Sequence, residues 1–173
     1  IDGEQRDLHD VIHGDSAVSI ITIDSNEGLE IMRHTLTAQV LARAIKNLYP
    51  KSKLAIGPTI EDGFYYDVEC SKTISIDDLE KIENEMNKII KAKSSITKKL
   101  LSKKDALNVF KSLDEPYKQE IINDSSQEKS FQLYYQDDDN FVDLCRGPHL
   151  PNLAFIGSFK LTKVSGAYWK GDS

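Results

Sequence analysis

The densest run of reactive side chains in the sequence is Asp143-Leu144-Cys145-Arg146-Gly147-Pro148-His149. It brings a carboxylate, a thiol and an imidazole into one short segment at the end of the predicted strand 141–144. The Gly-Pro pair predicts a tight bend, and loops at strand ends commonly carry binding and catalytic groups. We therefore expect this loop to form part of a site.

A second imidazole, His34, lies within a long predicted helix. One Cys and two His can ligate zinc, and His34, Cys145 and His149 would provide three such ligands. The alternative is that His34 is an ordinary helix histidine and that Cys145 is a small buried apolar side chain, which residue type alone favours. Residue types and spacing therefore leave zinc binding, acid–base chemistry and packing open.

Hydrophobic periodicity predicts the elements that position these groups. Apolar residues recur every three or four positions over 29–49, with Pro50 as a stop, which predicts a helix of about six turns. Ser-x-x-Asp pairs predict two further helix starts, at Ser75 and Ser102. Runs of β-branched and aromatic residues between turn residues predict strands. These runs are 18–23, 53–56, 64–68, 131–135, 141–144, 159–163 and 167–170.

The mixture of helices and strands has no regular βαβ repeat. We therefore predict an α+β fold in which the long helix packs on a mostly antiparallel sheet. The acidic run 137–139 is predicted to be a hairpin turn in solvent, because a metal site there would need ligands converging from elsewhere.

Composition excludes several classes of protein. The chain has 173 residues, of which 39% are hydrophobic and 29% charged, as is typical of a globular domain. No apolar run approaches the roughly 20 residues of a membrane span, and the N-terminus resembles no secretory signal. Cys70 and Cys145 lie in different contexts, which favours a reducing compartment over a disulfide scaffold. Ile1 and the end at Ser173 are expected to be domain boundaries.

Five segments carry a resemblance to a known family. They are Arg33-His34-Thr35, Ala55-Ile56-Gly57-Pro58, Gly63-Phe64-Tyr65-Tyr66-Asp67, the run 143–149 and Gly166-Ala167-Tyr168-Trp169-Lys170-Gly171-Asp172-Ser173. In this order they resemble the editing domain of bacterial-type threonyl-tRNA synthetases. Residues 1–24 resemble the end of the TGS domain that precedes it, so the predicted boundaries are 1–24 and 25–173. The class II aminoacylation core and the anticodon-binding domain have no counterpart in this sequence.

The resemblance implies a deacylase that proofreads a cytoplasmic threonine–tRNA ligase. Its reaction is hydrolysis of the ester that joins serine to the 3′-terminal adenosine of tRNA(Thr). Serine lacks one methyl group of threonine, which is worth only about 1 to 3 kcal/mol of discrimination, so a second pocket must supply the rest. The implied partners are the acceptor end of tRNA(Thr), the seryl group and the remainder of the synthetase. No membrane, metal or cofactor is implied for this segment.

The resemblance also implies the residues of the pocket. The family has a His-x-x-x-His pair on the long helix, a Tyr on the following hairpin, a Lys between the middle helices, and the Asp, Cys and His of the strand-end loop. The implied catalytic residues are His34, Lys118, His149 and Gln39, and the implied substrate-binding residues are Tyr66, Asp143 and Cys145. An imidazole would orient water, Lys118 would bind ribose or stabilise negative charge, and Asp143 would bind the ammonium or hydroxyl of serine.

The long helix departs from the family pattern. Where the second His is expected, the chain has Ala38, and Gln39 fits the family frame only if one residue is inserted. On a regular helix five residues span about 500°, so His34 and Gln39 would point about 140° apart. A π-bulge would absorb the insertion and bring them to one face. Gln39 can form hydrogen bonds but cannot titrate.

Three functions therefore compete. The first is editing, and the second is a structural module that binds the tRNA acceptor end after the chemistry has decayed. The third is a zinc hydrolase or zinc-structured domain, for which we expect no stoichiometric zinc. Because the net charge is -6, contact with tRNA would need a local basic surface. The alternative interpretation of such a surface is a set of lysines that only contact solvent. The lysines expected to guide the acceptor end are Lys98, Lys99, Lys103 and Lys104, or Lys160, Lys163 and Lys170.

Overall fold

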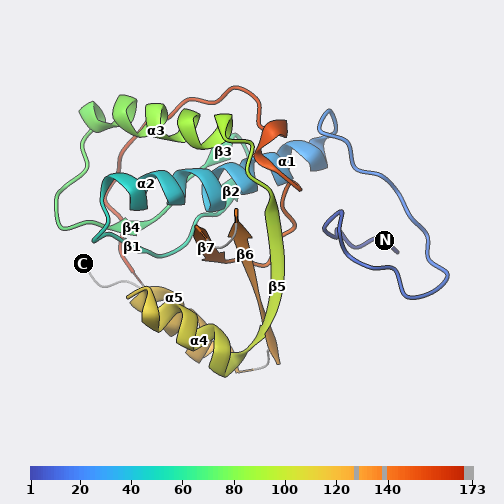
Figure 1. Cartoon of the computed structure of the whole chain (residues 1–173). Helices are drawn as coiled ribbons and strands as arrows, with labels where there is room; N and C mark the ends of the chain where they lie inside the picture. The colour runs from blue at the N-terminus through green and yellow to red at the C-terminus, as the bar shows by residue number, and fades with distance from the viewer. Residues whose placement is uncertain (127–128, 138–139, 170–173) are drawn as a thin grey trace.

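The long helix forms as predicted, in three consecutive parts. The computed structural model describes residues 1–126, 129–137 and 140–169. In it, α1 (Asn26–Thr35), the π-helix η1 (Leu36–Leu41) and α2 (Ala42–Leu48) follow one another without a break (Figure 1). The amide of Ala42 donates to the carbonyl of Thr37, five residues earlier, which is the hydrogen bond that defines a π-turn. The apparent insertion left two alternatives, a regular helix or a π-bulge, and the structure has the π-bulge.

The buried face of this helix packs against α3 (Leu79–Lys91). All six residues of η1 are buried, and Val40 and Ile45 share a core cluster with Ile82 and Met86 of α3. The predicted capping box of Ser75 is present, although its first turn is the 3₁₀-helix η2 (Ile76–Asp78). Each fully buried apolar side chain contributes about 1.5 to 3 kcal/mol, so this cluster fixes the helix that carries His34.

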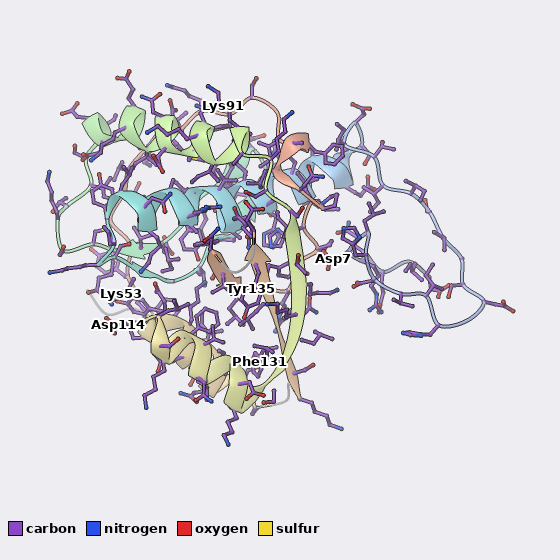
Figure 2. The ribbon with its side chains drawn as sticks, in the orientation of Figure 1. Asp7, Lys53, Lys91, Asp114, Phe131 and Tyr135 are labelled. Atoms are coloured by element: carbon purple, nitrogen blue, oxygen red, sulfur yellow. The ribbon has the colours of Figure 1, made fainter. Side chains whose placement is uncertain are left out.

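A three-stranded antiparallel sheet lies beneath the long helix (Figure 1). Its order is β5 (Ile96–Ser102), β6 (Ser130–Gln136) and β7 (Phe141–Leu144). Alternate side chains of β6 point to opposite faces: Tyr134 joins the core under the long helix, whereas Phe131, Leu133 and Tyr135 pack toward the other helices. Phe131 and Tyr135 are labelled in Figure 2. These are α4 (Lys103–Ser112), capped by Ser102 as predicted, and α5 (Pro116–Asp124).

Two short hairpins complete the fold. β1 (Lys53–Leu54) pairs with β4 (Val68–Glu69), and β2 (Thr59–Ile60) pairs with β3 (Gly63–Phe64). All strand pairs are antiparallel, so the predicted α+β class is confirmed. No helix in the described part of the chain is both long enough and apolar enough to cross a membrane.

Several predicted strands are wrong. The run 18–23 forms no strand and its apolar side chains are exposed, because no backbone within the described residues pairs with it. The run 159–163 is extended but pairs with α3 instead: the amide of Leu161 and Nζ of Lys160 both donate to Glu83, at 2.6 and 2.8 Å. Residues 167–169 also form no strand, and Lys170 lies outside the described residues.

Two strands, β2 and β5, were not predicted. β5 is the edge strand of the sheet, and its two lysines and exposed Leu100 hide the alternation of apolar and polar residues. The predicted turn between β6 and β7 lies where expected, with Asn140 donating its amide to the carbonyl of Asp137 at 3.2 Å. Asp138 and Asp139 lie outside the described residues.

Candidate functional site

The loop after β7 is held against the sheet by Gly147. This residue has φ 66°, a conformation that favours glycine, and a Cβ there would lie 1.9 Å from the hydroxyl of Tyr134. The amide of Cys145 continues the strand pairing by donating to the carbonyl of Gln132 at 3.2 Å. The chain thus bends immediately after Cys145, and the bend returns His149 beneath the long helix.

His34, Cys145 and His149 form a compact cluster in which His149 is buried and the other two are partly buried. The rings of His34 and His149 stack with centroids 4.6 Å apart and planes 5° from parallel. Nε2 of His34 lies 2.7 Å from Sγ of Cys145. The segment that carries His34 and the strand-end loop therefore face each other, as the resemblance implied.

Burial keeps this cluster uncharged. It lowers the pKa of His34, although the charges of Asp143 and Asp7 oppose the shift. Burial lowers the pKa of His149 further, and the neighbouring His34 adds to this effect. Burial also raises the pKa of Cys145 to about 12. At neutral pH both imidazoles are neutral and the thiol keeps its proton, which argues against Cys145 as a nucleophile.

A second buried cluster joins Lys118, Tyr66 and Asp143. Nζ of Lys118 lies 2.6 Å from Oδ1 of Asp143 and donates to the hydroxyl of Tyr66 at 2.9 Å. The Tyr66 hydroxyl donates to Oδ2 of Asp143 at 2.8 Å. Burial raises the pKa of Tyr66 well above its usual value, and the Asp143 charge adds to the shift, so the phenol stays protonated. Lys118 is only 2% exposed, so it is not an ordinary surface lysine.

Neighbouring elements hold this second cluster in place. Gly57 lies against Tyr66, since a Cβ there would be 2.3 Å from the ring. Pro116 begins α5, and the preceding Glu115 is buried. Glu115 accepts from Nζ of Lys46 at 2.6 Å and from the amide of Leu54 at 2.7 Å. α5, which carries Lys118, is thereby tied to α2 and β1.

Gln39 is hydrogen-bonded to Gln136 of β6, which belongs to neither cluster. Its backbone carbonyl and Oε1 accept from Nε2 of Gln136 at 2.7 and 3.0 Å, and Arg43 donates to Oε1 of Gln136 at 2.9 Å. Nε2 of Gln39 is buried and has no partner among the residues described. The π-helix therefore presents Gln39 to β6, whereas His34 faces the loop.

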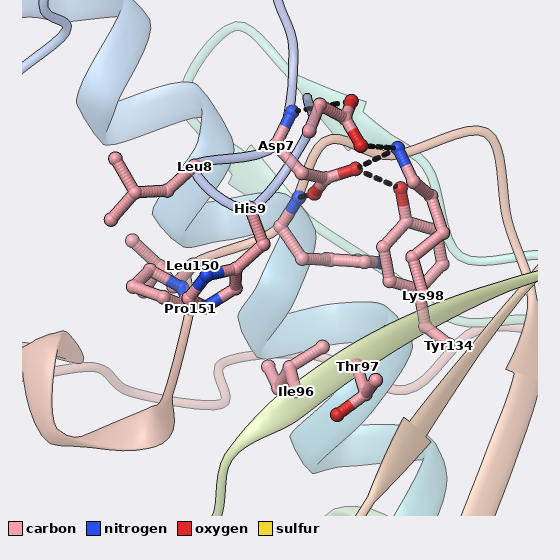
Figure 3. A pocket seen from close by; sticks show the side chains of 11 residues that line it. Asp7, Leu8, His9, Ile96, Thr97, Lys98, Tyr134, Leu150 and Pro151 are labelled. Carbon is pink, nitrogen blue, oxygen red and sulfur yellow. Dashed lines mark hydrogen bonds and ion pairs between the residues drawn. The ribbon is translucent and has the colours of Figure 1, made fainter. Parts of the chain in front are cut away.

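Two residues at the cluster were not singled out from the sequence. Thr35 is fully buried, with Oγ1 3.0 Å from Nδ1 of His149, and was quoted only as part of the resemblance. Asp7 accepts from the hydroxyl of Tyr134 at 2.7 Å and from the amide of His149 at 2.9 Å. Figure 3 shows it bridging Tyr134 and Lys98 beside a cavity of about 140 Å³. Nothing in the sequence around Asp7 indicated this contact.

Several lysines of the expected basic surface already have partners within the chain. Lys98 pairs with Asp7 and Asp10, and Lys103 donates to the carbonyl of Asn123 at 2.9 Å. Lys99 lies 4.0 Å from the ring centre of Tyr135, and Lys160 pairs with Glu83. Intramolecular carboxylates therefore neutralise part of this surface, and its role in binding stays a prediction.

The His34, Cys145 and His149 cluster is also the group that could hold a metal ion. Its three donor atoms lie within 4.8 Å of one another. Two ligands of one tetrahedral zinc stand about 3.5 Å apart, whereas His34 Nε2 and Cys145 Sγ are 2.7 Å apart. The two atoms are therefore closer together than shared ligation of one zinc would place them.

Comparison of the sequence with known proteins shows which proteins the chain resembles. Residues 132–173 match the family described as "Threonyl and Alanyl tRNA synthetase second additional domain". Threonine--tRNA ligases from Coxiella burnetii and Desulfatibacillum aliphaticivorans are 46% and 50% identical to the chain over its whole length. The chain is therefore similar to one segment of threonine--tRNA ligases, and its last part matches the second additional domain. It spans 26% of the length of these relatives, and the same share of the ligase from Prochlorococcus marinus, which is 46% identical over 97% of the chain.

The site extends beyond the second additional domain as the family model delimits it. Asp143, Cys145 and His149 lie inside the matched residues 132–173, on β7 and its loop. His34, Tyr66 and Lys118 come from earlier in the chain and reach the same place through the long helix, the hairpins and α5. The candidate site is therefore shared between the matched part and the elements before it.

Proposed function

We propose that the chain hydrolyses the ester bond of seryl-tRNA(Thr), as the editing part of a threonyl-tRNA synthetase. The observation that carries this proposal is the adjacency of two buried clusters of different character. One is neutral, with two imidazoles and a thiol, and the other contains the ion pair of Lys118 and Asp143. They meet at the end of β7, where Asp143 and Cys145 are two residues apart.

The two clusters suit the separate demands of ester hydrolysis. The Asp143 carboxylate is an acceptor for the ammonium or hydroxyl of serine, and the Lys118 ammonium can stabilise negative charge that develops on oxygen. Water attacks the carbonyl carbon, the bond to the ribose oxygen breaks, and that oxygen takes up a proton. A neutral imidazole can orient the water or accept its proton, and the lowered pKa of His34 and His149 keeps them neutral at pH 7.

Specificity for serine would come from the size of the pocket. Cys145 and Tyr66 are partly buried beside Asp143, and both are packed against the main core cluster. A methyl group adds volume that such a wall can reject only by steric overlap, because the hydrogen-bonding groups of serine and threonine are the same. We propose that the acyl pocket admits the seryl group and excludes the threonyl group.

A single-turnover deacylation assay tests this proposal. Seryl-tRNA(Thr) is the substrate, threonyl-tRNA(Thr) is the control substrate, and Asp143→Asn is the variant that leaves size unchanged while removing the charge. The expected result is fast loss of serine, slow loss of threonine and strong impairment by Asp143→Asn. A wild-type rate equal to the spontaneous rate of ester hydrolysis would overturn the proposal.

A second candidate function is a module that binds the tRNA acceptor end without catalysis. The observation that favours it is Gln39, which cannot titrate and is engaged by Gln136. Binding of the acceptor end without hydrolysis, in the same assay, would support this function instead. Zinc at stoichiometric occupancy by elemental analysis would favour the third candidate, for which we expect a negative result.

The wider context of the chain follows from the same proposal. The acceptor end of tRNA(Thr) and the remaining domains of the synthetase would be its partners, in the cytoplasm. The division into a TGS-like part at 1–24 and an editing domain at 25–173 is tested by limited proteolysis, which should cut first near Asp24.

A further inference from the structure

Thr35 contacts the candidate site through a short chain of hydrogen bonds. It is the last residue of α1, directly before the π-helix, and is fully buried. Its Oγ1 lies 3.0 Å from Nδ1 of His149 and accepts from the amide of Leu150, also at 3.0 Å. One hydroxyl therefore contacts both the imidazole and the backbone that follows it.

The direction of the bond to His149 follows from counting protons and lone pairs. A threonine hydroxyl has one proton and two lone pairs, and the Leu150 amide occupies one lone pair. Within residues 1–126, 129–137 and 140–169, Nδ1 of His149 is the acceptor recorded for the hydroxyl proton. The reverse arrangement would leave that proton buried without an acceptor, which costs about 1 to 3 kcal/mol. Thr35 therefore donates, and Nδ1 accepts.

The protonation of the other ring nitrogen of His149, Nε2, follows from this. The neutral imidazole carries one proton, which must reside on Nε2 when Nδ1 is an acceptor. Nε2 is buried and has no hydrogen-bond partner in the described part of the molecule. A buried N–H without a partner is unfavourable in the free protein and is satisfied when a ligand supplies an acceptor.

We propose that Thr35 is a positioning residue that holds His149 as the Nε2–H tautomer, so that His149 acts as a hydrogen-bond donor. Resting on the proposed function, the acceptor is an oxygen of the substrate: the ester carbonyl, which becomes negatively charged during attack by water. Nε2 in this tautomer has no lone pair free to take a proton from water. His149 thus stabilises the oxyanion, and proton transfer falls to another group.

NMR on the 173-residue chain tests the tautomer without any substrate. The protein has four histidines, so long-range ¹H–¹⁵N spectra are simple, and loss of signals in His149→Gln assigns His149. The expected wild-type result is a protonated Nε2 and an unprotonated Nδ1 that accepts a hydrogen bond. A proton on Nδ1 in the wild-type protein would overturn the proposal, whatever the variants do.

Three substitutions separate this role from packing. Thr35→Val keeps the shape but removes the hydroxyl, and should shift the Nδ1 signal of His149 away from its hydrogen-bonded value. Thr35→Ser restores the hydroxyl and should restore that signal. Thr37→Val is the matched control, because Thr37 is equally buried in the same helix but donates to the carbonyl of Tyr65 at 2.6 Å. An Nδ1 signal that is unchanged in Thr35→Val, or changed alike in Thr37→Val, would contradict the proposal.

Hydrolysis provides the second readout. Thr35→Val should lower the single-turnover rate with seryl-tRNA(Thr) by on the order of tenfold relative to Thr35→Ser, with little change in KM, because one hydrogen bond made in the transition state is weakened. If the wild-type chain hydrolyses no ester, the proposed function fails while the tautomer result stands. If the chain hydrolyses the ester but His149 carries its proton on Nδ1, the inference about Thr35 fails alone.

Discussion

The buried ion pair of Lys118 and Asp143 gives the sharpest prediction about stability. Both side chains are nearly inaccessible, at 3% and 2% exposed, and Nζ lies 2.6 Å from Oδ1. Lys118→Met removes the cation and leaves the carboxylate buried with Tyr66 and a backbone amide as its partners. Loss of one partner of a buried pair costs about 3 to 5 kcal/mol, so we expect a loss of this size in the free energy of unfolding.

Urea denaturation measures this loss, with a control at an exposed pair. Lys160 pairs with Glu83 at 2.8 Å, but its side chain is 72% exposed, so the same change, Lys160→Met, should cost less than about 1 kcal/mol. With a denaturant slope of about 2 kcal/mol per molar urea, Lys118→Met should lower the midpoint by about 1.5 to 2.5 M. Nearly equal midpoints for the two variants would refute the reasoning.

Removing the whole buried cluster distinguishes a lost attraction from an uncompensated charge. The triple variant Lys118→Met, Asp143→Leu, Tyr66→Phe removes the cation, the anion and the hydroxyl between them, and leaves mainly the amide of Leu144 without its acceptor. Because no charge remains buried, it should lose less stability than Lys118→Met alone. A loss equal to the sum of the single changes would show that the charge argument is wrong.

Three further predictions concern the helix, pH and salt. The first is the substitution Gln39→His, made without removing a residue from the helix, because the π-helix already accommodates the extra residue. If Gln39 limits catalysis, hydrolysis of seryl-tRNA(Thr) should rise by up to about 10²-fold to 10⁴-fold. No gain in a folded variant would exclude Gln39 as the limiting residue. Burial lowers the pKa of His34 and His149, so the unfolded chain binds protons more readily than the folded chain. The free energy of unfolding should therefore fall as pH drops below about 6.5. Equal urea midpoints at pH 7.5 and 5.5 would contradict this prediction. Binding of the tRNA acceptor end should weaken as salt rises if lysines contact phosphates, whereas salt-independent binding would assign those lysines to the solvated surface.

The sequence was most informative where local pattern and packing agree. The helix 29–49, the two serine caps and the strand Phe141–Leu144 follow from periodicity and capping, and each forms where expected. The runs 18–23 and 159–163 have strand-forming residues but no strand forms, since pairing depends on a partner that composition does not reveal. β5 was missed for the opposite reason: it pairs with β6 despite two lysines and an exposed leucine.

The candidate site was partly predictable, for a related reason. Motifs indicated which residues belong together, but not how they are protonated or which atoms meet. The neutral state of Cys145 depends on its burial, which a sequence does not give. The contact of Thr35 with His149 joins residues 114 positions apart, and that of Asp7 with His149 joins residues 142 apart. Such contacts depend on tertiary structure and leave no local signal.

The π-turn also allows the orientation of α1 to differ from that of α2 when a residue is added between them. Each residue added to an ordinary α-helix turns everything beyond it by about 100°, which would carry Ile45 and its neighbours out of the core. Here the added residue is absorbed within Leu36–Leu41, so α1 can aim His34 at the loop while α2 keeps its packing against α3. The direction in which α1 presents its side chains is therefore set separately from that of α2. One residue more or less at this point can therefore turn the face that carries His34 without disturbing the hydrophobic interior.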